Sequence, residues 1–326
     1  MQVELPLVIY PSVTERVITA PSMTVIICTY SPRRWEVLSA AVASVSSQAY
    51  PALETIIVID HNAELLQRAE AAFRDALVIE STGARGLSDA RNAGVKVARG
   101  DVVAFLDDDA VADDTWLQEL ARAYDDPNVV GAGGVASPQW VGGQASRWLP
   151  CEFYWTVGCT YCGLPTECAP IRNPIGANMS FRRAVFDQIE GFATGIGRVG
   201  LTPLGCEETE LSIRARRAFP GGVVLYVPSA RVEHLVPTER ASWRYFVSRC
   251  WAEGLSKALV TEEVGSKDAL SSEWVYALRT LPAGVLRGLS DGVRGDHTGY
   301  LRATAIIGGF LVTAAGYVRG RLAAGR

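Results

Sequence analysis

The chain has no excess of basic residues, and this bears on the partners it can bind. Its 326 residues include 31 Lys and Arg against 35 Asp and Glu, for a formal net charge of −4 at pH 7. Nucleic-acid-binding domains carry clustered Lys and Arg and a high pI, whereas the pI here is about 5.6. We therefore expect no nucleic-acid partner. With 48% hydrophobic and 20% charged residues, the composition is typical of a folded protein.

The first 22 residues lack the pattern of a secretory signal. Such a signal has a basic region followed by an apolar core, but Glu4 and Glu15 stand here among scattered apolar residues. We expect residues 1–22 to form an N-terminal extension and the catalytic part to stay in the cytoplasm.

Cysteine is present in an odd number, seven, which does not suit a complete disulfide framework. Cys28, Cys206 and Cys250 lie in apolar segments where a buried thiol behaves as a small hydrophobe, so we expect them to be reduced. The other four fall in one short stretch: Cys151, Cys159, Cys162 and Cys168. One pair has the Cys-x-x-Cys spacing of a zinc site, but the remaining spacings fit no standard ligand pattern, and the role of the group stays open.

What the chain does contain is a repeated alternation of strand-like and helical runs. The predicted strands are 23–28, 55–59, 76–79, 102–106 and 129–135, and the predicted helices are 34–46, 64–74, 87–98 and 115–124. Repeated βα units predict an α/β fold with a doubly wound, mostly parallel sheet flanked by helices. Ligands bind outside the carboxyl ends of the strands in such sheets.

Three consecutive carboxylates, Asp107, Asp108 and Asp109, follow directly on the apolar run 102–106. A divalent cation would offset their repulsion. Mg²⁺ and Mn²⁺ take hard oxygen ligands together with substrate phosphates, so the run predicts a site for a metal and a diphosphate. A solvated acidic turn that caps the next helix is the alternative.

Polar residues also follow two other predicted strands. Thr29 and Tyr30 come after the first strand and Asp60 after the second, so that these ends and the acidic run can converge on one crevice. Taken singly, Thr29 could cap a helix and Asp60 could be a turn residue.

The segment 85–94 is typical of an anion-binding helix start. Gly86 allows the backbone to turn, and the N-terminus of the helix after it can face an anion. Arg85 or Arg91 could contact a diphosphate or the acidic residues, and Asn92 could bind a sugar or ribose hydroxyl. The alternative is a capped surface helix whose Arg pairs with an acid elsewhere.

Together, these segments resemble the family 2 glycosyltransferases, which are inverting, nucleotide-sugar-dependent enzymes of the GT-A fold. The matching segments are 28–30 with Arg33 or Arg34, 59–60, 86–94, 107–109, 178–183, 191–192, 207–211 and His234. The resemblance implies a nucleotide-sugar-binding half at 23–137, an acceptor and catalytic half at 138–258, and a C-terminal helical segment at 259–326.

The resemblance also implies roles for the donor site. Asp60 would contact the base, usually uracil, and Thr29 and Tyr30 would shape the base and ribose pocket. Asp109 would ligate Mn²⁺ or Mg²⁺, with Asp107 at the ribose or in the metal shell. The expected donor-binding residues are Thr29, Tyr30, Asp60, Arg85, Arg91, Asn92, Asp107 and Asp108. His234, one of only three histidines, would complete the metal shell as it does in several relatives.

Inverting transfer needs a base that deprotonates the acceptor hydroxyl. On a helix Glu207 and Glu210 share a face, whereas Glu208 points about 100° away, so one acid can reach the cleft while its neighbours bind Arg214 or solvent. By the resemblance Glu208 is the base, with Glu207 as the alternative; an acidic first turn favoured by the helix dipole is the reading without a catalytic role. On the acceptor side we expect Asn178, Trp155 and Glu210. The glycine-rich segment 191–205 is either a lid over the donor or a passive loop.

Near the end, residues 303–318 form an apolar run between Arg302 and Arg319, slightly short for a membrane-spanning helix. Arginines before and after it suit a helix on the anionic inner face of a cell membrane, and a packed terminal helix or a dimer contact is the alternative. The sequence predicts a metal-dependent inverting glycosyltransferase that moves a sugar from a nucleotide donor, UDP-linked by expectation, to a saccharide or lipid-linked acceptor in surface glycan assembly. A scaffolding protein of the same fold and a sugar nucleotidyltransferase are the competing hypotheses.

Overall fold

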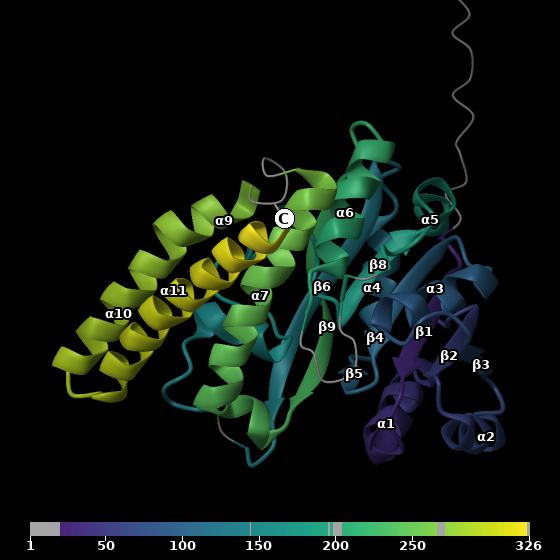
Figure 1. Ribbon diagram of the computed structural model, residues 1–326. Coiled ribbons are helices and arrows are strands. Elements are labelled where there is room, and N and C mark those ends of the chain that lie inside the picture. Colours follow the sequence, from purple (N-terminus) through teal and green to yellow (C-terminus); the bar gives the residue numbers. More distant parts are fainter. Residues whose placement is uncertain (1–19, 144, 195, 198–203, 266–270, 325–326) are drawn as a thin grey trace, which may run out of the picture.

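The computed structural model describes residues 20–143, 145–194, 196–197, 204–265 and 271–324. Its centre is a nine-stranded sheet in the order β3-β2-β1-β4-β8-β6-β9-β5, with β7 added beside β9. Figure 1 shows β1 to β3 at one side of the molecule and the C-terminal helices gathered at the other.

The first half of the chain forms the predicted βα units. Its strands β1 (Met23–Thr29), β2 (Glu54–Asp60), β3 (Leu77–Ser81) and β4 (Val102–Asp107) pair in parallel. Its helices are α1 (Trp35–Ser46), α2 (Ala63–Ala72), α3 (Leu87–Val97) and α4 (Trp116–Ala123). Each lies within a few residues of its predicted bounds, because continuous apolar runs and helical periodicity both give strong local signals.

The second half makes the sheet mixed rather than mostly parallel. It contains β5 (Ala110–Ala112), β6 (Val129–Trp140), β7 (Ala169–Ile171), β8 (Asn178–Arg182) and β9 (Val223–Val236). β8 enters beside the carboxyl end of β4 and runs antiparallel to both β4 and β6, while β9 runs parallel to β6. The sequence predicted β6 as the strand 129–135, but β5, β7 and β8 are only three to five residues long and carry little periodicity, so their antiparallel pairing was not predicted.

Helices cover both faces of the sheet. Buried side chains of α1, α2 and α4 pack on one face, and those of α3, α5 (Arg183–Ile189) and α6 (Glu207–Ala218) pack on the other. Because both faces are covered, the central strands β1 and β4 are apolar along nearly their whole length. The carboxyl ends of the parallel strands are left to form a site.

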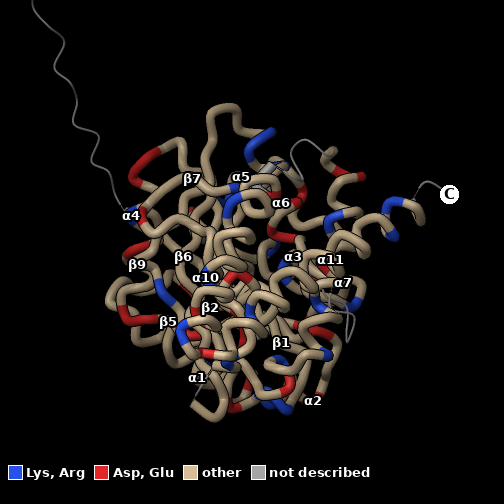
Figure 2. The backbone as a smooth tube through the Cα atoms, turned by 90° about the vertical axis from the view of Figure 1, so that its left-hand side faces the viewer, with Lys and Arg blue, Asp and Glu red and all other residues tan. Residues whose placement is uncertain are grey.

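The C-terminal extension is a layer of long helices. α7 (Trp243–Val264) is followed by α9 (Ser271–Val275), the π-helical turn η4 (Tyr276–Thr280), α10 (Leu281–Val293) and α11 (Thr298–Ala324). In Figure 2 the molecule is turned so that this layer lies toward the viewer. α11 approaches α7 very closely: a Cβ on Gly254 would lie 2.1 Å from the carbonyl oxygen of Thr313, so glycine is required at this contact.

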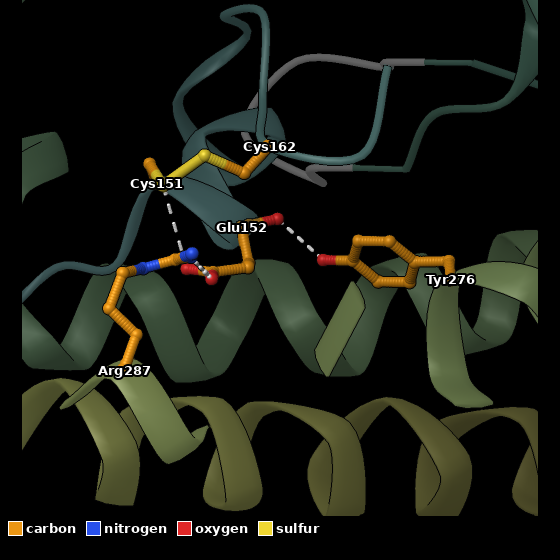
Figure 3. The surroundings of a disulfide bond; sticks show 5 residues. All are labelled: Cys151, Glu152, Cys162, Tyr276 and Arg287. Atoms are coloured by element: carbon orange, nitrogen blue, oxygen red, sulfur yellow. Dashed lines mark hydrogen bonds and ion pairs between the residues drawn. A yellow bond between two sulfur atoms is a disulfide. The ribbon is translucent and has the colours of Figure 1, made fainter. Parts of the chain in front are cut away.

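An aromatic segment between β6 and β7 joins the sheet to this layer. Its 3₁₀ helix η2 (Cys151–Val157) buries Phe153 against Phe246 of α7 and Ile306 of α11. Figure 3 shows how it is fastened: the Glu152 carboxylate pairs with Arg287 of α10, and the Tyr276 hydroxyl donates to the Glu152 carbonyl. The aromatic residues of this segment therefore build a core between the sheet and the helices.

The cysteines separate into two kinds. Cys151 and Cys162 form a disulfide, with a Cα–Cα distance of 5.4 Å, which uses one cysteine of the Cys-x-x-Cys pair and decides the role that the sequence left open for these two residues. Cys28, Cys206 and Cys250 carry free thiols, as predicted. Cys159 is also free and is fully buried.

Candidate active site

A cavity of about 890 Å³ opens where β1, β2 and β4 end. The predicted donor residues that line it are Thr29, Tyr30, Asp60, Arg85, Arg91, Asp107, Asp108 and Asp109. The structure thus brings together side chains from segments up to 80 residues apart in the sequence, as the carboxyl ends of parallel strands should.

Asp60 lies at the end of β2 and faces the start of α3. Its carboxylate accepts a hydrogen bond from the Gly86 backbone N–H at 3.1 Å and contacts Nδ1 of His61 at 2.6 Å. Gly86 has φ +144°, in the region that favours glycine, and is the N-cap residue of α3. The turn therefore fixes Asp60 beside the helix start at the mouth of the cavity.

Strand pairing places His234 beside the acidic run. β5 begins directly after Asp109 and pairs Ala110 with His234 of β9, and the Leu235 N–H donates to the Asp109 carbonyl at 2.8 Å. Nε2 of His234 then lies 3.2 Å from Oδ1 of Asp109. Two residues 125 positions apart in the sequence are held together by backbone hydrogen bonds.

These residues fit a divalent cation. Asp107, Asp109 and His234 each offer one ligand atom, and the three atoms lie within 4.8 Å of one another. Asp108 adds a buried Oδ2 atom with no hydrogen-bond partner among the described residues, a further oxygen that a cation or a donor could satisfy. Two carboxylates and an imidazole suit Mn²⁺ and also accommodate Mg²⁺.

Two arginines also reach this cluster. Arg34, from the short 3₁₀ helix η1 (Pro32–Arg34), has Nη1 2.8 Å from Oδ1 of Asp108 and pairs through Nη2 with Asp109. Arg240, on η3 (Thr238–Ala241), has Nη2 3.4 Å from Oδ2 of Asp109. The sequence offered Arg34 only as one of two alternatives, and it gave no signal for Arg240, whose position depends on the course of β9.

The protonation of the cluster follows from burial and from these pairs. Burial raises the pKa of Asp108 to about 7 despite its contact with Arg34. Burial acts in the same direction on Asp109, but His234, Arg34 and Arg240 outweigh it and hold the pKa of that carboxyl far below its usual range. For His234 the two effects are reversed. Burial lowers its pKa, but the Asp109 carboxylate has the larger effect and raises the pKa of His234 to about 10. Asp109 is thus charged at neutral pH, as a carboxylate ligand of a metal must be, whereas His234 would release its proton on binding a metal.

Arg91 connects the acidic run to the second half of the site. Its side chain is 2% exposed, and its guanidinium lies 2.9 Å from Oε1 of Glu207, 3.3 Å from Oδ1 of Asp107 and 3.2 Å from the Gly176 carbonyl. Oε1 of Glu207 is therefore engaged by Arg91, while its Oε2 is buried with no hydrogen-bond partner among the described residues. Breaking such a buried pair would leave an uncompensated charge.

Glu208 behaves differently from its neighbour. It lies in the first turn of α6, lines the cavity, and makes no ion pair with any described residue. Burial raises its pKa to about 8, and the adjacent Glu207 carboxylate acts in the same direction. A carboxylate with a raised pKa that faces a cavity is a candidate general base.

Three predicted site residues lie outside the cavity lining. Asn178 is fully buried. Its side-chain oxygen accepts a hydrogen bond from the Trp116 indole, and its amide nitrogen donates to the carbonyls of Val135 and Ala230. Glu210 pairs with Arg214 one turn along α6. In this structure both side chains hold the fold together and neither lines the cavity, and their acceptor role stays a prediction.

Asn92 is the third such residue, since its amide bonds with the N–H and carbonyl of Phe192. Trp155, by contrast, lines the cavity as expected. Residues 195 and 198–203 of the segment 191–205, considered above as a lid, lie outside the described residues, and its role stays a prediction.

Comparison with known proteins agrees with this arrangement. The family model "Glycosyl transferase family 2" matches residues 24–190. The chain is 36% identical over 242 residues to the glucosyl-dolichyl phosphate glucuronosyltransferase of Haloferax volcanii, covering 73% of this chain and 77% of the relative. It is 29% identical over 273 residues to the succinoglycan biosynthesis protein ExoM of Rhizobium meliloti, covering 79% and 80%.

A solved structure shares the fold. The mannosyltransferase PcManGT from Pyrobaculum calidifontis, solved in complex with GDP-Man and Mn²⁺, superposes with a TM-score of 0.56 at 18% identity, covering 92% of this chain and 88% of that one. The resemblance drawn from the motifs is thus confirmed, and the chain belongs to the family 2 glycosyltransferases, with a GT-A fold and a C-terminal helical extension.

Proposed function

We propose that this glycosyltransferase is metal-dependent and inverting, that its donor is UDP-linked, and that Glu208 is its base. The observation that carries the proposal is the contrast between two adjacent carboxylates on α6. Arg91 holds Glu207, while Glu208 lines the cavity with its pKa raised to about 8. Both carboxylates line the cavity, and the one without a guanidinium partner among the described residues is the base in this proposal.

The chain's own residues account for the main tasks of the reaction. Glu208 accepts the proton of the acceptor hydroxyl, and the acceptor oxygen attacks the anomeric carbon from the face opposite the departing diphosphate, which inverts that centre. Asp107, Asp109 and His234 would hold Mn²⁺ or Mg²⁺, which supplies positive charge against the diphosphate. Arg34 and Arg240 add fixed cations to the same end of the cavity.

The position of Asp60 supports uracil as the nucleobase of the donor. Asp60 is fixed at the cavity mouth by Gly86, and Thr29 and Tyr30 line the same end. A carboxylate in this place can accept a hydrogen bond from the imide N–H of uracil. This supports a UDP-linked donor.

A calorimetric titration tests the donor and metal assignments together. UDP, GDP and dTDP are added to the full chain with Mn²⁺ present, with Mg²⁺ present and again with EDTA. We expect UDP to bind with the metal and to lose most of its affinity in EDTA. Binding of GDP alone would overturn the base assignment, and equal binding in EDTA would overturn the metal assignment.

The acceptor we propose is lipid-linked and lies at the inner face of a membrane. The Haloferax volcanii relative is named for a dolichyl phosphate substrate. One helix of the described chain, Thr298–Ala323 in α11, is long and apolar enough to cross a membrane, with a mean hydropathy of 1.5, and only 28% of that stretch is buried. Its exposed face carries large apolar side chains: Leu301, Ile307, Phe310, Leu311, Val318 and Leu322.

α10 extends this face with further exposed side chains, Leu286, Leu289 and Val293. Arg287 lies on α10, Arg319 and Arg321 lie on α11, and Arg279 and Arg294 lie just before and just after α10. Apolar side chains flanked by arginines suit the headgroup boundary of an anionic leaflet. Figure 2 views this side and shows Lys, Arg, Asp and Glu only at scattered positions among other residues.

We expect Leu286→Glu and Leu311→Glu each to weaken binding to vesicles of phosphatidylglycerol and phosphatidylcholine by about tenfold, since burial of one leucine contributes about 1.5–3 kcal/mol. Co-sedimentation measures the effect. The control is Leu53→Glu, because Leu53 is 51% exposed and lies on the opposite side of the sheet before β2. Equal loss in all three variants, or no loss in either helix variant, would contradict a lipid contact at α10 and α11.

A further inference from the structure

The cavity is also lined by a second group of charged side chains, which come from other elements than the metal-site residues. Arg249, Glu253 and Lys257 lie on successive turns of α7, Arg172 follows β7, and Glu273 belongs to α9. All five line the cavity. We call them the α7 cluster.

The side chains of the α7 cluster form a connected network. Nζ of Lys257 lies 2.5 Å from Oε1 of Glu273 and 3.1 Å from Oε1 of Glu253. Arg172 also pairs with Glu273, and Nη2 of Arg249 lies 3.7 Å from Oε2 of Glu253. Within this network of described residues three cations face two carboxylates, and each of the five side chains is 10–23% exposed. A concentration of guanidinium and ammonium groups in a cavity favours a phosphate ligand.

The α7 cluster adjoins the proposed base. Sγ of Cys206, two residues before Glu208, lies 3.3 Å from Oε1 of Glu253. A Cβ on Gly205 would lie 3.7 Å from Nη2 of Arg249. An anion held by this cluster would therefore lie close to the start of α6, on which Glu208 sits.

An apolar wall continues from the same part of the cavity. Phe310, Thr313, Ala314 and Tyr317 of α11 line the cavity at the i, i+3, i+4 and i+7 spacing of a single helix face. Phe310 is 45% exposed, so this wall reaches the surface next to the apolar face of α11. The cavity thus presents a base, then cations, then an apolar path to the outside.

We propose that Arg172, Arg249 and Lys257 bind the phosphate of a lipid-linked glycosyl phosphate acceptor, whose lipid chain leaves along α11. This deepens the proposed function and rests on it. One sugar ring then spans the interval between the phosphate on the α7 cluster and the hydroxyl that Glu208 deprotonates. Guanidinium groups offer the phosphate paired N–H donors, and the lysine adds a point charge.

The test compares farnesyl phosphate with farnesol, each in neutral detergent micelles, by the change in tryptophan fluorescence of the full chain. We expect farnesyl phosphate to bind at least about tenfold more tightly than farnesol, as hydrogen bonds to charged groups allow. Arg249→Gln should remove most of that preference. Glu273→Gln removes a negative charge from the α7 cluster and should strengthen farnesyl phosphate binding, whereas a purely structural role would make both variants weaker.

The control variant is Arg99→Gln, which also removes an ion-paired arginine but lies outside the cavity, with its side chain 73% exposed. It should change neither affinity. Inorganic phosphate is the third probe: if it binds as tightly as farnesyl phosphate, the ligand is a free anion and the lipid part of the proposal is wrong.

UDP titration with Mn²⁺ in the same variants separates the two proposals. UDP binding that survives in Arg249→Gln, together with a lost preference for farnesyl phosphate, supports the acceptor site. UDP binding with no preference for farnesyl phosphate in the unmodified chain overturns this inference alone. Failure of the unmodified chain to bind UDP, GDP or dTDP overturns the proposed function instead, and a loss of UDP affinity in Arg249→Gln with farnesyl phosphate binding unchanged would assign the cluster to the donor.

Discussion

Glu208→Gln is expected to reduce sugar transfer by about 10²- to 10⁴-fold, the range that a positioned general base contributes. Glutamine keeps nearly the same shape and can still hydrogen-bond, but it cannot accept the proton of the acceptor hydroxyl. Because Glu208 makes no ion pair with a described residue, its loss should leave UDP binding in the presence of Mn²⁺ unchanged. Initial rates at saturating donor, compared with calorimetric affinities, measure the two effects separately.

The pH dependence gives a second readout of the same residue. Burial, reinforced by Glu207, raises the pKa of Glu208 to about 8. Since the deprotonated form is the active base, the transfer rate should rise with pH up to about 8 and then level off. A rate profile that stays flat through this range would contradict the assignment of Glu208.

The free energy of unfolding should fall as pH rises, whereas the transfer rate should rise. The folded protein holds the Glu208 proton more tightly than the unfolded chain, whose pKa is near 4.5, so the contribution of this group is fully present below pH 4.5 and is lost as pH rises toward 8. The Glu208→Gln variant has no titrating group at this position, so this pH-dependent loss of stability is absent from it. The difference in melting temperature between variant and unmodified chain should therefore grow in favour of the variant across this interval.

Glu207→Gln is the matched comparison on the same helix turn. Glu207 holds the buried guanidinium of Arg91, so its substitution leaves a buried cation with less compensation. We expect that variant to lose stability and nucleotide binding together. If instead Glu207→Gln abolishes transfer with binding intact and Glu208→Gln does not, the two roles are reversed.

Asp109→Asn is expected to remove the metal dependence of donor binding, with a loss of UDP affinity of about 10²-fold in Mn²⁺. The asparagine preserves volume and one oxygen but removes the charge that faces His234, Arg34 and Arg240. In EDTA the variant and the unmodified chain should bind UDP with similar affinity. Calorimetry with and without Mn²⁺ gives all four affinities.

Asp114→Asn supplies the control, because Asp114 is an exposed acidic residue just beyond β5. It should retain the response to Mn²⁺ in full. A response to Mn²⁺ that persists in Asp109→Asn would contradict the metal site at Asp107, Asp109 and His234.

The residues that the sequence located correctly are those that follow strong local signals. Asp60 and the run Asp107 to Asp109 come directly after apolar strands, and the parallel pairing of β1, β2 and β4 necessarily places those strand ends together. The sequence offered Arg85 or Arg91 as a contact of a diphosphate or the acidic residues, and the structure pairs Arg91 with Asp107.

Residues whose roles depend on distant partners were harder to assign. Asn178 and Glu210 lie in motifs of the family, yet the structure directs Asn178 to Trp116 and Glu210 to Arg214. Nothing in the sequence near Arg240 indicates that β9 carries it to Asp109. The pairing of Cys151 with Cys162 was likewise hidden, because connectivity within a group of cysteines cannot be read from spacing.

One face of α11 lines the cavity, and this has a consequence for the kinetics of sugar transfer. Phe310, Thr313, Ala314 and Tyr317 line the reaction chamber, while Leu311 on the same helix is 60% exposed. With that helix seated on lipid, the donor reaches the enzyme by diffusion in three dimensions and the acceptor by diffusion in two. Turnover would then follow the mole fraction of acceptor in the bilayer rather than its bulk concentration, and adding inert lipid at constant acceptor would slow the enzyme by surface dilution.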